Sequence, residues 1–369
     1  MDAMKLAVTG LGLVTSIGHG VVGSCAALHA GLSRPGPLGG FVVDDGSGEA
    51  VPITGYPVAS FAEGFFQTGA WVRLASGAFE DLLHAAQPPT RPDFWHRTGL
   101  LALTPLVDPD RFGWSLEDLP DALETSYVQP LLSLLEVPIR KENARALALG
   151  HCALAGALLQ AREMLESRRV DRVLVLAADS YVDPMSLTWL AHHRRLKSPR
   201  WPVGLMPGEA GGALLVEAPA AARTREASAI VHVESAVVDG PAEPGSIPAR
   251  LGRVLADAVK RVLPAHTPHP FRGDLFLDLN GEEWKAQVWG HAQVLLAGQL
   301  DLLRCRTVLP ADSLGETGAA GAPVALAASA WAFLREHASG EHALVCALSD
   351  NGQVSAVLLG HAKASTAVS

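Results

Sequence analysis

Apolar runs of strand length alternate with helical segments along most of the chain. These runs are continuous rather than interrupted by polar residues, which is typical of strands that are buried on both faces of a sheet. We therefore expect an α/β protein whose sheets are largely covered by helices. The pattern predicts strands at residues 5–9, 99–104, 145–149, 172–177 and 212–217, a helix at 20–30, and loops at 34–55 and 87–93.

The rhythm restarts after an alanine-rich, charged segment at 218–226. A strand, a turn and a helix at 145–153 look like the counterpart of the same sequence of elements at 274–282. No short-period repeat is present, so a solenoid is excluded, and we expect a duplication of two α/β halves, 1–218 and 219–369. The second half is predicted to contain strands at 230–238, 274–279, 343–347 and 354–359, the last two paired, and helices at 247–263, 283–300 and 319–335.

One long stretch without charged residues, 317–334, approaches the length of a membrane span. It consists mostly of Ala, Gly and Ser and contains Pro323. A helix that is apolar on all sides is also expected in the middle of a large core, covered from every direction. We predict a buried helix at 319–335 rather than a span.

Composition and charge narrow the function further. The chain has 369 residues, 49% of them hydrophobic, and a net charge of −9 from 29 basic and 38 acidic side chains. A surplus of negative charge disfavours a nucleic-acid binder and a membrane-surface protein, because both need basic side chains to neutralise phosphates. Residues 1–8 contain one Lys and no long apolar run, so we expect no signal peptide and a cytoplasmic location.

Several motifs that carry chemistry are missing or incomplete. Residues 9–18 follow a predicted strand and resemble a dinucleotide-binding turn, but Thr15 stands where GxGxxG needs its third glycine. Neither a P-loop nor a GxSxG nucleophile elbow is present. The four cysteines, at positions 25, 152, 305 and 346, form no CxxC pair, so we expect neither a zinc site nor disulfides, and no cofactor.

Four blocks, in order along the chain, resemble the β-ketoacyl synthases, which have the thiolase fold. They are the strand and loop at 8–21, the His-Cys-Ala-Leu-Ala-Gly turn with the helix and strand after it at 151–180, Pro-Gly-Glu-Ala-Gly-Gly within 196–217, and Leu-Gly-Glu-Thr-Gly-Ala-Ala-Gly at 314–321. The resemblance implies two βαβαβ halves related by a pseudo-twofold axis, stacked as α-β-α-β-α layers. It also implies a homodimer.

The resemblance places the nucleophile turn at the start of the helix near 153. Decarboxylative condensation needs a cysteine thiolate, which the amides at a helix N-terminus favour, and two histidines. Counting back from Asp171 puts His151 at the nucleophile position, with Cys152 one residue late. Successive residues there point about 100° apart, so Cys152 is expected to face another wall. A register slip would instead make Cys152 the nucleophile, and His151 could simply fill a lost active site.

The two family histidines are also absent. Asn280 takes the place of the first, and Gly315 or Glu316 takes the place of the second. Asn can donate a hydrogen bond to an oxyanion but cannot shuttle a proton, and a carboxylate would repel an enolate. All three catalytic positions depart from the family pattern at once, which points to lost condensation. Alternatively, His151, Asn280 and Glu316 converge on one pocket, where a His with a carboxylate partner could act as a general base.

Three functional hypotheses follow. The first is a cytoplasmic, dimeric, ketosynthase-like protein that no longer condenses acyl chains and serves as a binding or scaffolding partner. The second is an active acyltransferase or 3-oxoacyl synthase that uses Cys152 or His151 on thioesters of coenzyme A or of an acyl-carrier protein. The third is an adaptor or chaperone for a bacterial type VI secretion effector, since short degenerate proteins of this kind occur beside such genes.

Overall fold

The first half of the chain forms a five-stranded arrangement in the order β6-β5-β7-β8-β1. The computed structural model describes residues 4–115, 117–240, 247–263 and 270–362. β6, β5 and β7 are parallel, whereas β8 and β1 follow as antiparallel neighbours. The strands are β1 (Leu6–Thr15), β5 (Thr98–Thr104), β6 (Ala144–Ala148), β7 (Arg172–Ser180) and β8 (Glu209–Glu217), and a short β2 (Gly18–His19) pairs with β1.

The second half repeats this arrangement in the order β11-β10-β12-β13-β9, with the same sequence of parallel and antiparallel pairs. The first residues of β1, Leu6–Val8, also pair with β9, so the two halves share one hydrogen-bonded sheet. The α/β class and the pairing of the last two predicted strands are therefore confirmed. The strands are β9 (Val231–Asp239), β10 (Asp274–Leu277), β11 (Arg306–Val308), β12 (His342–Leu348) and β13 (Val354–His361).

The strand order corrects one predicted correspondence. Residues 145–153 begin with β6, which lies at one end of its half, whereas residues 274–282 begin with β10, which lies between β11 and β12. The counterpart of β6 is therefore β11, and the counterpart of β10 is β5. The sequence suggested the wrong pair because a buried strand followed by a polar turn and a helix occurs twice in each half. Whether the chain divides at 218/219 into two folding units stays a prediction.

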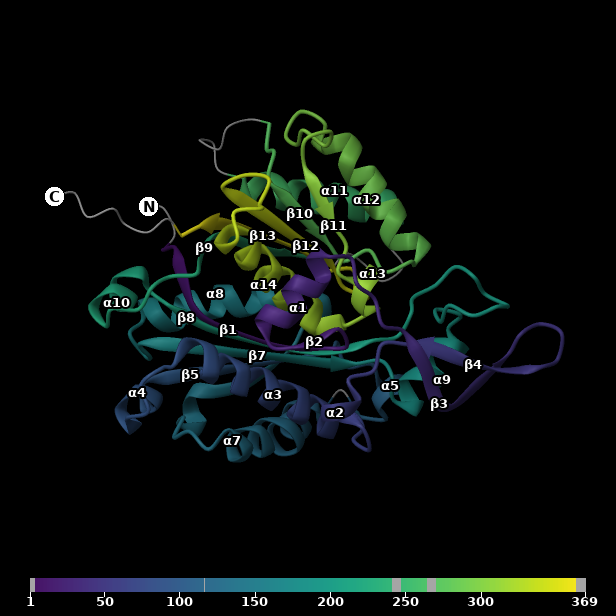
Figure 1. Cartoon of the computed structure of the whole chain (residues 1–369), viewed down its shortest axis with the longest axis horizontal. Coiled ribbons are helices and arrows are strands. Elements are labelled where there is room, and N and C mark those ends of the chain that lie inside the picture. The colour runs from purple at the N-terminus through teal and green to yellow at the C-terminus, as the bar shows by residue number, and fades with distance from the viewer. Residues whose placement is uncertain (1–3, 116, 241–246, 264–269, 363–369) are drawn as a thin grey trace.

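Helices form three layers around the two halves of the sheet (Figure 1). α8 and α14 lie between the two halves, and α1 lies beside α14. The outer face of the first half is covered by α3, α4 and α7. The outer face of the second half is covered by α11 and α12. The central helices are α1 (Val21–His29), α8 (Ala153–Glu166) and α14 (Gly321–Leu334), and the outer ones are α3 (Thr68–Ala86), α4 (Pro92–His96), α7 (Gln129–Leu135), α11 (Pro248–Val262) and α12 (Glu283–Leu296).

Alternation along the strands explains these layers. In β7, Val173 and Val175 face the central helices, whereas Leu174 and Leu176 face the outer ones. Both faces of the strand are thus apolar, which is why the sequence shows continuous apolar runs. The predicted α-β-α-β-α stacking is confirmed.

α14 is the predicted buried helix. Nearly all of its side chains, from Ala322 to Phe333, are buried, because sheet covers it on two sides. No helix among the described residues is long and apolar enough to cross a membrane.

The predicted loop at 34–55 is wrong. It forms a hairpin of β3 (Gly36–Asp44) and β4 (Ala50–Gly55), whose strands hold glycines and prolines between short apolar stretches. This hairpin projects from the body of the molecule beside α9 (Figure 1). The remaining short elements are α2 (Ala59–Ala62), α5 (Pro109–Phe112), α6 (Leu119–Leu123), a π-helical turn at Glu124–Val128, a 3₁₀ turn at Lys141–Asn143, α9 (Pro184–His192), α10 (Pro219–Thr224) and α13 (Ala311–Leu314).

Two glycines let α3 approach the sheet. A Cβ atom on Gly12 of β1 would lie 1.9 Å from the carbonyl oxygen of Ala78, and one on Gly211 of β8 would lie 2.2 Å from that of Leu74. Both oxygens belong to the α3 backbone, so no side-chain rotation could relieve the contact. The position of α3 therefore depends on residues without a side chain in the two strands below it.

Candidate functional site

The turn between β6 and α8 has the geometry of a helix start that presents one side chain. Gly150 has φ 54°, and a Cβ there would lie 3.1 Å from Ser349 Oγ and 3.2 Å from the Leu106 backbone nitrogen, so the position requires glycine. His151 and Cys152 follow in one turn of 3₁₀ helix, from which α8 continues. This turn sets His151 at the N-terminus of the buried α8.

The same turn recurs before α14. Thr317 (φ −115°, ψ 9°) repeats the backbone of Leu149 (φ −112°, ψ 7°), and Gly318 (φ 49°) repeats that of Gly150. Ala319 therefore stands where His151 stands in the first half. The backbone of the turn is therefore the same in both halves, but at this position only the first half carries a titratable side chain.

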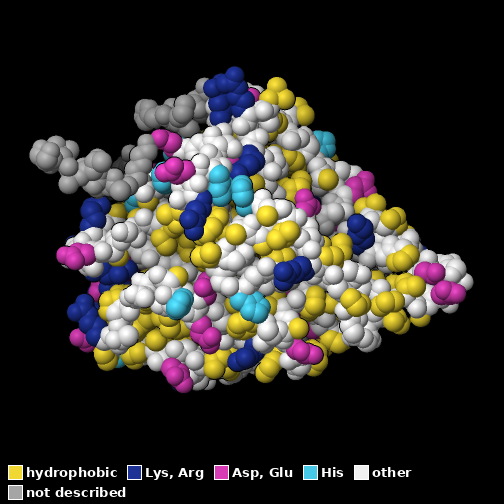
Figure 2. Space-filling model, in the orientation of Figure 1, with side chains coloured by type: hydrophobic (Ala, Val, Ile, Leu, Met, Phe, Trp, Pro, Cys, Tyr) yellow, Lys and Arg dark blue, Asp and Glu magenta, His cyan; other side chains and the backbone are white. Residues whose placement is uncertain are grey.

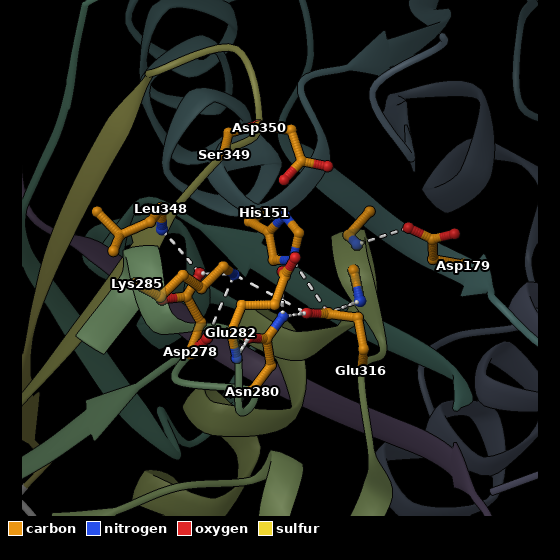
Figure 3. A network of polar contacts seen from close by, with 12 residues as sticks. His151, Asp179, Asp278, Asn280, Glu282, Lys285, Glu316, Leu348, Ser349 and Asp350 are labelled. Atoms are coloured by element: carbon orange, nitrogen blue, oxygen red, sulfur yellow. Dashed lines mark hydrogen bonds and ion pairs between the residues drawn. The ribbon is translucent and has the colours of Figure 1, made fainter. Parts of the chain in front are cut away.

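His151 is 5% exposed, and its Nε2 lies 3.0 Å from Glu316 Oε1 (Figure 3). Burial and the nearby Lys285 lower the pKa of His151, but the charge of Glu316, its hydrogen bond and the charge of Asp278 outweigh them and leave this pKa raised. His151 and Glu316 thus form a buried hydrogen-bonded pair whose ionised form is favoured by the raised pKa of His151.

Glu316 is fixed in both its backbone and its carboxylate. Its N–H donates to Met206 O at 2.7 Å, and its carbonyl accepts from Gly208 N at 3.0 Å. Oε1 also accepts from Gly318 N at 2.7 Å, and Oε2 accepts from Asn280 Nδ2. Burial raises the pKa of this carboxyl group, but the charges of His151 and Lys285 outweigh it and hold the pKa well below its usual range.

Asn280 links two carboxylates in the loop after β10. Its Nδ2 donates to Glu316 and, at 3.0 Å, to Glu282 Oε2, while its Oδ1 accepts from Glu282 N. Gly281 follows with φ 96°, a conformation that favours glycine. The structure thus brings His151, Asn280 and Glu316 together, and Asn280 connects two acidic groups.

Lys285 is a member of the network that the sequence did not single out. Its side chain is 0% exposed, and its Nζ lies 2.9 Å from Asp278 Oδ2 and 3.8 Å from Glu316 Oε2. The signal was present, because Lys285 lies on the apolar stripe of α12. That stripe consists of the buried residues Lys285, Val288, Trp289, Ala292 and Leu296.

Arg195, which belongs to the first half of the chain, connects the network to two carboxylates of the second half. Its guanidinium contacts Glu282 at 2.6 and 2.9 Å and Asp350 at 2.8 and 3.0 Å. Asp350 also lies near the His151 ring, on the side away from Glu316 (Figure 3). The cluster among the described residues thus holds four carboxylates, those of Asp278, Glu282, Glu316 and Asp350. Its basic groups are His151, Lys285 and Arg195, so the net charge of the cluster is closest to zero when His151 is protonated.

Cys152 faces away from this network, as the sequence predicted. Its side chain is 0% exposed, and its Sγ lies 3.8 Å from Ala347 O. Burial raises the pKa of this thiol to about 12, which is the opposite of what an activated nucleophile requires. Cys152 is thus a small buried thiol.

The cavity beside His151 is small, about 30 Å³, which is room for one or two water molecules. Gly315 and Glu316 both line it, but a Cβ on Gly315 would lie 2.5 Å from the Tyr56 ring, so this position has no side chain to offer. Ligand pockets are about ten times larger. No three His, Cys, Asp or Glu side chains among the described residues could hold a metal ion.

The raised pKa of His151 predicts a pH dependence of stability. A group that binds its proton more tightly in the folded protein stabilises it fully below the unfolded pKa, about 6.5, and loses that contribution as pH rises through the folded pKa. Urea unfolding above pH 6.5 should therefore show the wild type losing up to about 1.4 kcal/mol per pH unit relative to His151→Gln. The exposed His84→Gln is the control and should follow the wild type; equal slopes for all three proteins would contradict the buried ion pair.

No protein-family model and no curated protein matches this chain. Solved structures do match it. A type II polyketide synthase acyl-carrier protein in complex with its ketosynthase bound to the hexaketide is 15% identical, with a TM-score of 0.73, covering 97% of this chain and 100% of that one. The ishigamide ketosynthase/chain length factor is 18% identical, with a TM-score of 0.73 and coverage of 97% and 99%.

A ketosynthase from module 6 of the bacillaene synthase of Bacillus subtilis 168 is 12% identical, with a TM-score of 0.77. The match covers 98% of this chain and 72% of that one. Identities this low establish the fold alone, and the strand order, the three helical layers and these similarities agree on it: the chain has the thiolase-like fold of the ketosynthases.

Proposed function

We propose that this ketosynthase-like protein does not condense acyl chains and acts as a binding or accessory protein. The observation that carries the proposal is the buried ion pair between His151 and Glu316 at the nucleophile turn. Nε2 of His151 is held by Glu316, and the raised pKa favours a protonated ring, which has no free lone pair with which to attack a thioester or accept a proton. Cys152, with a pKa near 12, is almost wholly a thiol at neutral pH.

The size of the cavity supports the same conclusion. A volume of about 30 Å³ leaves no room for an acyl chain beside His151. The charged groups around it satisfy one another, which is the condition under which a buried ionic network is stable. We interpret the site as a structural clamp that joins the loops of the two halves.

Intact-protein mass spectrometry after incubation with acyl-CoA and acyl-carrier-protein thioesters tests this proposal. We expect no stoichiometric adduct on the wild type, whereas a condensing ketosynthase run in parallel should become acylated. Cys305→Ala is the control for chemical background, because Cys305 is the least buried of the four cysteines. An adduct that maps to Cys152 or His151, and is lost in Cys152→Ala or His151→Ala, would establish the active acyltransferase instead.

Partners follow from the proposal. β6 pairs with β5 alone within the described residues, so its outer edge can accept a strand from a second copy of the chain. Among the similar structures, one contains an acyl-carrier protein and another is a ketosynthase/chain length factor. We infer a homodimer, with an acyl-carrier protein as a further candidate partner. The adaptor role for a secretion effector and the cytoplasmic location stay predictions.

A further inference from the structure

A second, larger cavity of about 430 Å³ lies between the β3–β4 hairpin, α2 and the start of α9. It shares no lining residue with the cavity beside His151. Its volume lies in the range of small-molecule sites. Apolar side chains form much of its wall, namely Leu38, Phe41, Phe65, Phe66, Val182 and Leu187.

Phe65 and Phe66 stand at the cavity with 47% and 59% of their surfaces exposed. Hydrophobic side chains also gather along the base of the projection that the hairpin forms beside α9 (Figure 2). Exposed neighbouring aromatic rings on a cavity are unusual in a monomer surface and indicate a bound apolar group.

Two buried carboxylates line the same cavity. Glu209 is 2% exposed, and its oxygens accept from Val58 N at 2.6 Å and from Ser180 Oγ at 2.7 Å. Asp183 is 4% exposed, and its Oδ1 accepts from the first N–H groups of α9, Met185 and Ser186. Asp183 Oδ2 is buried and has no hydrogen-bond partner among the described residues. A buried carboxylate oxygen without a partner is costly, which points to a ligand that completes it.

The charge on the wall of this cavity is negative. Glu63 also lines the cavity, and none of the described residues that line it is Lys, Arg or His. The charge of the buried Arg111 acts on Asp183 from behind the wall, but the hydrogen bonds of its guanidinium go to Asp179, Ser180 O and Ser186 Oγ. A group that completes Asp183 Oδ2 must therefore donate a hydrogen bond, and a positive charge on it would suit the three carboxylates of the lining.

We propose that this cavity binds a small organic ammonium ion, with the charged nitrogen on Asp183 Oδ2 and an apolar or aromatic body against Phe65, Phe66 and Leu187. The apolar wall suits the body of such a ligand, and the aromatic faces add cation–π attraction near the mouth. A divalent metal ion fits poorly, because Ca²⁺ and Mg²⁺ take at least six oxygen ligands, and the described residues at the cavity do not bring three acidic side chains together in a group that could hold a metal ion.

Titration calorimetry with phenethylamine tests the site, beside its neutral and anionic analogues 2-phenylethanol and 3-phenylpropanoate. We expect saturable binding of the amine and much weaker binding of both analogues. Asp183→Asn should weaken amine binding at least tenfold, because the free carboxylate oxygen becomes an amide NH₂. Asn caps helices as well as Asp, so α9 should stay intact.

Two further variants separate the site from general effects. Ala59→Trp places a large ring at an exposed position on the cavity and should block binding without disturbing the core. Asp45→Asn removes the same charge from the tip of the same hairpin, outside the cavity, and should bind like the wild type. The proposal is overturned if the amine does not bind, if 2-phenylethanol binds equally well, or if Asp183→Asn, folded as judged by circular dichroism, binds like the wild type.

Discussion

Replacing Glu316 by Ala should lower the free energy of unfolding by about 3–5 kcal/mol, the range found when one partner of a buried ion pair is removed. The substitution removes the negative charge that faces the buried His151 and Lys285. It also leaves the donors Gly318 N and Asn280 Nδ2 without the carboxylate that accepts from them. Urea unfolding at pH 6, where His151 is charged, measures the full effect.

The double variant His151→Leu, Glu316→Leu separates the lost charge pair from lost packing. Replacing both partners by apolar groups should restore part of the stability, because His151 is then no longer left as a buried charge without Glu316. Glu49→Ala, at an exposed position, controls for the loss of a carboxylate and should change little. If Glu316→Ala were as stable as Glu49→Ala, the network would not be the clamp that we propose.

Gly211→Ala should destabilise the protein by about 3 kcal/mol, at the upper end of what overpacking costs. The added Cβ would lie 2.2 Å from Leu74 O and 2.6 Å from Leu74 C, so α3 would have to move off the sheet. Thermal or urea unfolding of the purified variant measures the loss.

Gly290→Ala is the matched control, with the opposite sign. Gly290 lies within α12, and a Cβ there would meet nothing within 4 Å. Alanine is favoured over glycine inside a helix, so this variant should gain about 0.5–1 kcal/mol. A stable Gly211→Ala would show that α3 is not held against β8 as closely as the structure indicates.

Most of the layered fold could be predicted from the sequence, because both faces of each central strand are apolar. Val173 to Leu176 could be recognised as a strand without knowing which side faced which helix. The β3–β4 hairpin could not be recognised in this way, since its strands are held by pairing with each other and hold few buried side chains. Its pattern of glycines and acids is the same as that of a loop.

The site was predicted in part for a similar reason. His151, Asn280 and Glu316 occupy positions that a familiar motif marks, so their convergence could be inferred. Lys285 and Arg195 lie outside any such motif, and their roles depend on burial and on contacts between segments that are far apart in the chain. A lysine is normally exposed, so a sequence alone favours a solvated side chain at position 285.

The pairing of β1 with β8 and β9 has a consequence for synthesis. Residues 6–15 are synthesised before their partners at 209–217 and 231–233, which follow roughly 200 residues later. At about 5–20 residues per second, this apolar strand waits on the order of 10–40 seconds with both edges unpaired. The first half of the sheet is not complete until β1 pairs with β8, so the molecule is expected to fold slowly and late on the ribosome.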